Sequence, residues 1–238
     1  MKRIVVLTGA GVSRESGLKT FRDSDGLWNT YRIEEVATYE AWLANRALVL
    51  EFYNMRRKEL MTVQPNAAHF ALQKLEQKYD VRIITQNVDD LHERAGSSRV
   101  LHLHGELKKV RSTLNAGYVK TLEGWELKEG DLCPEGAQLR PHIVWFGESV
   151  PMFDEAVRIT KTAEMLIVIG TSLNVYPAAG LMHYAPDHCP VWLIDPGEFT
   201  FSSQPIPTHI KEPATTGVPR LVEQLLAPDP PTQINENK

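Results

Sequence analysis

Three side chains have the types and spacing that acid–base chemistry requires: His104, Asn87 and Asp89. A histidine has a reference pKa of about 6.5, so its neutral ring can accept a proton near physiological pH. Asn87 and Asp89 follow Gln86 at the end of an apolar run, where α/β proteins place reacting groups. Each residue alone has an ordinary structural interpretation, because Asn and Asp form turns and most histidines simply find a polar partner. Their role therefore depends on what surrounds them.

A glycine loop near the start of the sequence is suited to holding a phosphate. It follows the apolar residues 4–7 and contains Gly9, Ala10, Gly11 and Ser13. Glycines let the backbone turn tightly and approach a pyrophosphate, whose charge is met by amide groups at a helix N-terminus. Arg14 occupies the third glycine position of the ordinary dinucleotide fingerprint, so the loop alone is equally compatible with a plain turn. The polar stretch after it is suited to fold over a cofactor and contains Thr20, Phe21 and Arg22.

The elements that must position these residues alternate between two kinds. Short apolar runs rich in β-branched residues are typical of strands buried on both faces of a parallel sheet, and they cover residues 4–7, 81–85, 100–103, 165–169 and 191–194. Helices are predicted over 67–78, after the N-cap Asn66, and over 154–162 and 218–226. This alternation predicts an α/β fold of Rossmann type, with ligands at the carboxyl ends of the strands.

Two stretches interrupt the alternation and are expected to form a smaller second lobe. Residues 23–63 combine a loop with a helix over 40–60, for which Thr38 is the expected N-cap. Residues 106–140 are polar and show no clear periodicity. The Rossmann-type domain then comprises residues 1–22, 64–105 and 141–226. The polar, proline-rich tail, residues 227–238, is expected to be disordered.

Composition narrows the class of protein. The 238 residues are 42% hydrophobic, enough for a core, and the net charge of −4 provides no basic field for generic nucleic-acid binding. The two cysteines, Cys133 and Cys189, argue against a disulfide-built secreted scaffold. The apolar residues 4–7 are too few for a signal peptide, and no segment approaches the length of a membrane span. We therefore expect a soluble, cytoplasmic protein that binds neither nucleic acid nor a membrane.

Taken together, the motifs resemble those of the sirtuins. They cover about residues 3–195 in the family's order, as Gly9-Ala10-Gly11-Val12-Ser13 continuing to Thr20-Phe21-Arg22, Thr85-Gln86-Asn87-Val88-Asp89, His102-Leu103-His104-Gly105, Val144-Trp145-Phe146-Gly147-Glu148 and Gly170-Thr171-Ser172-Leu173. Five blocks in one order argue strongly against a chance similarity. The resemblance implies NAD as cofactor and removal of acyl groups from protein lysines, which yields nicotinamide and O-acyl-ADP-ribose.

The resemblance also implies a role for each of these residues. Asn87 and Asp89 would line the pocket for nicotinamide and its ribose, and His104 would deprotonate a ribose hydroxyl, a step typically worth about 10²–10⁴-fold. His102 would face the other way if this segment is a strand, and we expect it to be structural, as are His69 and His92. Asp195 would accept hydrogen bonds from the adenosine ribose and favour NAD over NADP. The remaining cofactor contacts would come from the glycine loop, Thr20, Phe21, Arg22, Gln86, Gly170, Thr171 and Ser172.

Two further groups of residues concern the substrate, an acylated-lysine protein or peptide. The family pairs such a peptide in a β-like arrangement with the segment that holds Val144, Phe146, Gly147 and Glu148, although a plain core strand would also explain these residues. Tyr53 and Arg56 lie three apart on the predicted helix and share a face. They resemble the Tyr-x-x-Arg motif that selects malonyl- and succinyl-lysine in class III sirtuins, and Ala37 matches the small residue that widens that pocket. An arginine and a tyrosine can grip a carboxylate, but plain deacetylation can accompany this preference.

One part of the family pattern is missing. Most sirtuins hold a structural zinc with four cysteines, and a closed zinc site needs four thiolate or imidazole ligands. Ser112 corresponds to the first of these cysteines, and Cys133 is the one cysteine between Glu106 and Arg140. We therefore expect no zinc, and we expect packing by Tyr118, Leu122, Trp125 and Leu127 to hold this module.

Other functions remain open at this point. An NAD glycohydrolase or ADP-ribosyltransferase would keep the nicotinamide pocket but would not need Tyr53, Arg56 or the peptide-pairing segment. A non-catalytic NAD-binding module would not need His104. An ordinary dehydrogenase is the weakest alternative, because the full dinucleotide fingerprint is missing. The sequence leaves the oligomeric state open and is compatible with a monomer.

Overall fold

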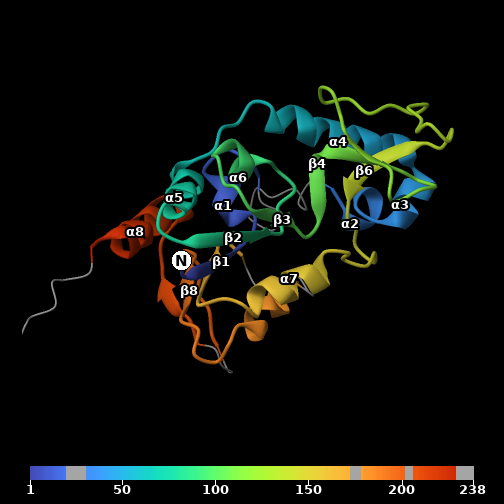
Figure 1. The fold of residues 1–238 in the computed structure, drawn as a ribbon. Coiled ribbons are helices and arrows are strands. Elements are labelled where there is room, and N and C mark those ends of the chain that lie inside the picture. Colours follow the sequence, from blue (N-terminus) through green and yellow to red (C-terminus); the bar gives the residue numbers. More distant parts are fainter. Residues whose placement is uncertain (20–30, 172–177, 202–205, 229–238) are drawn as a thin grey trace, which may run out of the picture.

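The computed structural model describes residues 1–19, 31–171, 178–201 and 206–228. A parallel six-stranded sheet in the order β3-β2-β1-β7-β8-β9 forms its larger part (Figure 1). The strands are β1 (Arg3–Thr8), β2 (Asp80–Thr85), β3 (Val100–His102), β7 (Met165–Ile169), β8 (Val191–Ile194) and β9 (Thr208–Ile210). The five predicted strands are confirmed, and β9 is an additional edge strand of three residues.

The sheet is buried on both faces because its side chains alternate between two cores. Ile4 and Val6 of β1 pack into one core, and Val5 and Leu7 pack into the other. Helices α5 (Ala67–Leu75) and α8 (Ala214–Leu226) pack together over the first face, whereas α7 (Phe153–Thr160) and the 3₁₀ helix η2 (Ala178–Tyr184) cover the second (Figure 1). This arrangement confirms the predicted Rossmann-type α/β fold.

Local capping decides where the helices begin. The Asn66 side chain accepts from the Ala68 amide and caps α5, as predicted. Thr38 accepts from the Ala41 amide at 3.0 Å, which confirms the second predicted cap. The single helix predicted over 40–60 is wrong, because Asn45 leaves the helical conformation and its side chain caps a new helix. The result is α3 (Tyr39–Ala44) followed by α4 (Arg46–Leu60), with α2 (Ile33–Val36) before them.

Residues 106–140, for which the sequence showed no periodicity, contribute to a second, antiparallel sheet in the order β5-β4-β6. Its strands are β4 (Gly105–Ser112), β5 (Val119–Thr121) and β6 (Leu139–Ile143). Leu107 and Val110 of β4 share a buried core with Trp42 and Phe52 of the helical stretch. The two insertions thus form one smaller lobe, as predicted.

Side chains of α4 hold this lobe together through hydrogen bonds to backbone groups. Asn54 Nδ2 donates to Leu127 O at 3.0 Å, and the Leu127 amide donates back to Asn54 Oδ1 at 2.9 Å. The buried Arg57 donates to Trp125 O at 2.7 Å and to Leu107 O at 3.4 Å. Leu127 is fully buried in the core, with Tyr118 and Leu122 packed against it. Tyr118, Leu122 and Leu127 thus pack as predicted, whereas Trp125 contributes its carbonyl, and these hydrogen bonds, which the sequence did not indicate, add to the packing.

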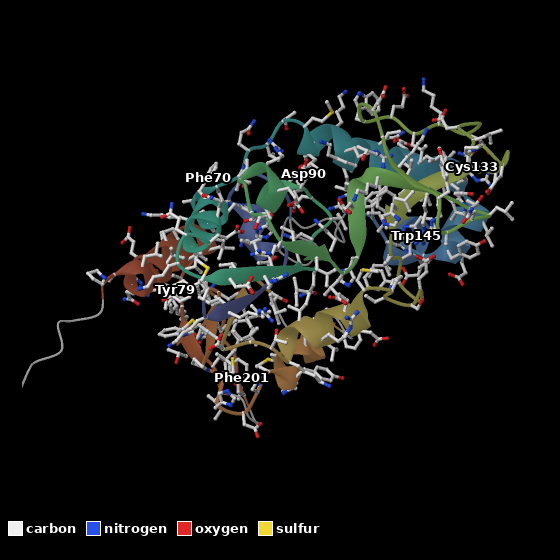
Figure 2. The ribbon with its side chains drawn as sticks, in the orientation of Figure 1. Phe70, Tyr79, Asp90, Cys133, Trp145 and Phe201 are labelled. Atoms are coloured by element: carbon white, nitrogen blue, oxygen red, sulfur yellow. The ribbon has the colours of Figure 1, made fainter. Side chains whose placement is uncertain are left out.

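Ser112 and Cys133, the two residues that bear on a zinc site, lie next to each other. The Ser112 hydroxyl accepts from the amides of Leu114 and Asn115, both at 3.1 Å. A hydrogen bond with Ser112 lowers the pKa of the Cys133 thiol, at the far side of the small lobe (Figure 2). Within the described ranges no group of three or more His, Cys, Asp or Glu side chains could hold a metal, so these residues do not fit a zinc site.

The helices of the described residues include none that is both long and apolar enough to cross a membrane.

Candidate active site

Two loops meet at the carboxyl ends of the neighbouring strands β1 and β7. The Gly9 amide donates to Ile169 O at 3.0 Å, and the Gly11 amide donates to Gly170 O at 2.8 Å. A Cβ on Gly11 would lie 2.6 Å from Gly170 Cα, and one on Gly170, whose φ is +58°, would lie 2.4 Å from Val12 N. Glycine is required here because two backbones touch, a reason that the sequence alone did not reveal. The same bare backbone is the feature that the predicted contact with a pyrophosphate requires.

A buried polar triad joins the short helix α1 (Gly11–Arg14), which follows Ala10, to the turn after β2. Ser13 Oγ donates to Asp89 Oδ2 at 3.0 Å and accepts from Asn87 Nδ2 at 3.2 Å. All three side chains are buried. Burial raises the pKa of Asp89 above its ordinary value, although the Leu91 amide and the Ser13 hydroxyl oppose the shift. The structure therefore brings together three residues that the sequence placed in two separate motifs.

His104 faces the same turn. Its Nδ1 lies 3.1 Å from Gln86 O, and because a carbonyl only accepts, Nδ1 carries the proton. The neutral ring then keeps a lone pair on Nε2, the form a general base needs. Burial lowers the pKa of His104, and the hydrogen bond to Gln86 O opposes this only in part. His104 is therefore neutral at physiological pH.

The other histidines partly depart from expectation. His69 Nδ1 accepts from the Asn66 amide at 3.2 Å, and His92 Nε2 lies 3.1 Å from Thr8 Oγ1. Burial lowers the pKa of His69 to about 4 and that of His92 well below its ordinary value, so both rings are neutral. Strand β3 ends at His102, so the strand geometry on which the expectation for His102 depended does not extend to His104. The two rings contact consecutive carbonyls of the turn after β2.

The remaining predicted cofactor residues divide into two groups. Thr171 follows Gly170, and its hydroxyl accepts from Gln86 Nε2 at 3.2 Å, so the loops after β2 and β7 are also joined. Asp195 follows β8 directly, and its Oδ1 accepts from the Gly197 amide at 2.8 Å. The predictions for Thr20, Phe21, Arg22 and Ser172 lie outside the described residues.

Tyr53 and Arg56 lie three residues apart on α4, close enough for the charge of Arg56 to act on the Tyr53 hydroxyl. Tyr53 is 2% exposed, and its hydroxyl accepts from Trp145 Nε1 at 3.0 Å. Burial raises the pKa of Tyr53 to about 12, although the nearby charge of Arg56 lowers it. Burial lowers the pKa of Arg56, against the opposing charges of Tyr53, Glu59 and Asp89.

Two further buried residues, Ala37 and Trp145, share a core with Tyr53. Ala37 is 4% exposed, and Trp145 is fully buried in the core of the small lobe. The sequence analysis placed Trp145 in a family motif and did not anticipate its hydrogen bond to Tyr53. Its aromatic side chain inside the predicted substrate segment was the available signal.

The segment 144–148 is extended at first and then turns. The Val144 amide donates to His104 O at 2.9 Å, and the Phe146 amide donates to Ala37 O at 3.0 Å. Gly147 has a φ of +86° and begins the turn. The carboxylate of Glu148 is engaged within the protein, since it accepts from Arg140 Nη1 at 2.6 Å and from the Trp145 amide at 2.8 Å.

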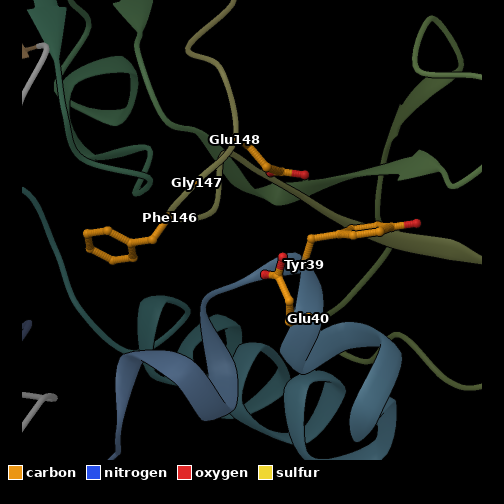
Figure 3. A pocket seen from close by; sticks show the side chains of 5 residues that line it. All are labelled: Tyr39, Glu40, Phe146, Gly147 and Glu148. Carbon is orange, nitrogen blue, oxygen red and sulfur yellow. The ribbon is translucent and has the colours of Figure 1, made fainter.

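These contacts lower the pKa of Glu148, although burial opposes the shift. A pocket of about 390 Å³ opens beside the turn, lined by Tyr39, Glu40, Phe146, Gly147 and Glu148 (Figure 3). In this view Glu40 points from the start of α3 toward the segment that carries Gly147 and Glu148, whereas the Tyr39 ring extends to the right, away from Gly147. Gly147 and the exposed Phe146 therefore remain accessible from this side.

Comparisons with known proteins agree with this arrangement. The Sir2 family profile matches residues 9–177. An NAD-dependent protein deacylase of Bacteroides thetaiotaomicron is 52% identical over 97% of this chain and 100% of its own length. One from Helicobacter pylori is 57% identical over 82% of this chain and 85% of its own length.

Solved structures give the same result. A Sir2 homologue in complex with NAD superposes with a TM-score of 0.84 at 41% identity, covering 94% of this chain and 89% of that one. A Sir2 protein bound to an acetylated peptide gives a TM-score of 0.75 at 30% identity, covering 93% of this chain and 92% of that one. Since the profile spans the glycine loop through the loop after β7, and relatives match nearly end to end, this chain belongs to the Sir2 family.

Proposed function

We propose that this protein is an NAD-dependent protein-lysine deacylase that prefers acidic acyl groups such as succinyl and malonyl. The observation that carries the proposal is the position of His104. Its Nδ1 proton is held by Gln86 O, one residue before Asn87, so a neutral base stands beside the Ser13–Asn87–Asp89 triad. Its NAD-dependent relatives and an NAD-bound Sir2 homologue support the choice of cofactor.

The residues present fit NAD. At Gly9, Gly11 and Gly170 a Cβ would meet the backbone of the neighbouring loop, and this bare backbone junction is proposed to form the cradle for the pyrophosphate. Ser13, Asn87 and Asp89 offer buried donors and acceptors for the nicotinamide and its ribose. Ala10, Gln86, Thr171 and Asp195 complete the proposed contacts, with Thr20, Phe21, Arg22 and Ser172 assigned by resemblance to the family.

Bound NAD supplies a ribose carbon from which nicotinamide can leave, so that the acyl oxygen of the substrate can bond to that carbon. The protein's part is to hold the groups and to move a proton. His104 Nε2 would take the proton of a ribose hydroxyl, because its Nδ1 already donates to Gln86 O. Lowering of its pKa by burial keeps this nitrogen unprotonated at physiological pH.

Tyr53 and Arg56 support a preference for acidic acyl groups. Trp145 donates to the Tyr53 oxygen, so the hydroxyl proton of Tyr53 is left to donate elsewhere. A pKa of about 12 keeps that proton in place. Together with the guanidinium of Arg56, this donor suits an acyl carboxylate, and the small side chain of Ala37 leaves room for it.

The substrate is proposed to be an acylated-lysine peptide that pairs with the backbone of 144–148. Because Glu148 is held by Arg140, its side chain would shape the turn, and Val144, Phe146 and Gly147 would supply the pairing groups. A Sir2 protein bound to an acetylated peptide supports this class of partner.

The test uses one lysine peptide in acetyl, malonyl and succinyl forms, incubated with the protein with and without NAD and analysed by mass spectrometry. We expect NAD-dependent loss of succinyl or malonyl in excess of acetyl. Arg56→Met should remove the preference while acetyl removal persists, and His104→Ala should abolish all three reactions. If NAD were cleaved while every acyl-peptide stayed intact, the protein would be an NAD glycohydrolase or ADP-ribosyltransferase and this proposal would fall.

A further inference from the structure

Two histidines hold two consecutive carbonyls of the turn that carries Asn87 and Asp89. His104 Nδ1 lies 3.1 Å from Gln86 O, and His102 Nδ1 lies 3.0 Å from Asn87 O. The backbone of the turn is thus fixed at the residue whose side chain contacts Ser13. The proposed catalytic role accounts for His104 but leaves His102 unexplained.

His102 lies between two acceptors. Its Nε2 is 2.8 Å from Glu93 Oε1, on the opposite side of the ring from Asn87 O, and its side chain is 8% exposed. A neutral imidazole carries one N–H, but a carbonyl and a carboxylate together require two. The geometry therefore favours the imidazolium, with both nitrogens donating.

The charges around the ring agree with this form. Burial lowers the pKa of His102, but the hydrogen bond and charge of Glu93 and the carbonyl of Asn87 outweigh burial, and the net pKa is raised. Glu106 on β4 also raises it. Asp89 in the turn and His92 on α6 (Leu91–Arg94) also interact electrostatically with His102.

Glu93 belongs to α6, which begins directly after the turn. Leu91, the first residue of this helix, donates its amide to Asp89 Oδ1 at 3.1 Å. The link from Asn87 O through His102 to Glu93 therefore closes the turn and the first residues of α6 into a single unit. If His102 is removed, the Asn87 carbonyl loses the donor that His102 Nδ1 supplies.

We propose that His102 and Glu93 form a positioning pair. Protonated His102 holds the backbone carbonyl of Asn87 and so keeps the side-chain amide of Asn87 hydrogen-bonded to Ser13, in the arrangement that binds NAD. This inference rests on the proposed function. Neither residue needs to touch the substrate. Neutral His102 keeps a single N–H, and the Glu93 carboxylate is a stronger acceptor for it than the Asn87 carbonyl. The donor to Asn87 O is therefore lost when His102 becomes neutral, and the affinity for NAD falls on the alkaline side.

The experiment measures kcat/KM for NAD against pH, with a saturating acyl-peptide, for the wild-type protein and four variants. In Glu93→Gln the pKa of His102 should fall, because a close negative charge is lost. The alkaline limb of the pH profile should therefore move at least about one pH unit lower. Glu106→Gln is the matched control, because its carboxylate bonds to Lys109 and only senses His102 at a distance. The alkaline limb of Glu106→Gln should move less than that of Glu93→Gln.

His102→Asn keeps an amide donor near the Nδ1 position without a titrating ring, whereas His102→Leu keeps neither. We expect His102→Asn to lack the alkaline limb and to retain most activity at neutral pH. We expect His102→Leu to raise KM for NAD by about tenfold or more. Thermal unfolding checks that each variant folds. An inactive wild-type protein would count against the proposed function alone.

The inference is decided by a readout that needs no turnover. The ¹⁵N shifts of the histidine rings should show His102 as an imidazolium at pH 7.5 in the wild type and as a neutral ring in Glu93→Gln. A neutral ring in the wild type, or an alkaline limb that neither His102→Asn nor Glu93→Gln changes, would overturn it.

Discussion

The indole Nε1 of Trp145 donates a 3.0 Å hydrogen bond to the hydroxyl of Tyr53, 92 positions earlier in the chain. Both side chains are buried, so this bond joins α4 to the segment that follows β6. The two residues come from segments far apart in the sequence. The bond therefore couples the packing of the small lobe to the proposed acyl pocket.

Tyr53→Phe should affect both properties. The indole N–H would lose its buried acceptor, which costs about 1–3 kcal/mol of unfolding free energy. Loss of the hydroxyl donor should lower kcat/KM for succinyl-peptides by about tenfold, with acetyl-peptides nearly unaffected. Denaturant unfolding and kinetics on both peptides measure these effects. Equal losses on the two peptides would show that Tyr53 has no part in selecting the acyl group.

Gly11→Ala should disrupt the contact between the loops after β1 and β7. Its Cβ would lie 2.6 Å from Gly170 Cα, a backbone atom that cannot move aside alone. We expect KM for NAD to rise at least about tenfold, together with a lower melting temperature. Gly117→Ala is the control, because its nearest neighbour is the Asn115 side chain at 3.3 Å. Wild-type NAD kinetics in Gly11→Ala would contradict the proposed cradle.

The pH dependence of activity should report His104 on its acid side. A base with a lowered pKa is neutral above that pKa and loses activity as it protonates, so the acid limb should lie below the ordinary value of about 6.5. His104→Ala should lower kcat by about 10²-fold or more. An acid limb above pH 7 would contradict the described burial of this ring.

Stability should also fall in acid, through His69. Its pKa is about 4 in the folded protein and about 6.5 when unfolded, so the unfolded state binds more protons between these values. The fully buried ring should therefore make stability fall from pH 6.5 to pH 4, by about 3 kcal/mol. In His69→Gln this part of the dependence should be missing from urea unfolding curves. An unchanged slope would assign the acid sensitivity to other groups, with His92 the next to examine.

The small lobe should be insensitive to metal removal. Dialysis against a strong chelator should leave both the melting temperature and NAD-dependent activity unchanged, because Ser112 and Cys133 bond to each other and the described residues add no further ligands to them. Asn54→Ala should instead destabilise the protein by about 2–3 kcal/mol, since it breaks both bonds to Leu127. Asn115→Ala, in an exposed turn of the same lobe, serves as control. A chelator-induced drop in melting temperature would require a metal after all.

The sequence by itself determined the periodic elements and the motif residues. Buried parallel strands appear as continuous apolar runs, so β1, β2, β3, β7 and β8 could be located, as could the caps Thr38 and Asn66. The order of the motifs identified the family resemblance, and their position after strands predicted where the polar residues would gather. Continuous apolar runs and side-chain caps are local properties, and local properties can be inferred from neighbouring residues.

Only the tertiary structure decided the contacts between distant segments. The antiparallel sheet of the small lobe depends on pairing between β4 and β6. Its strands lack a regular apolar pattern because the register of β4 shifts between Gly105 and Val110 and all three residues of β5 are exposed. The break at Asn45 arises because a side-chain cap competes with the helix backbone. The roles of Trp145 and His102 depend on partners on other elements, Tyr53 on α4 and Glu93 on α6, and no spacing along the chain encodes those distances.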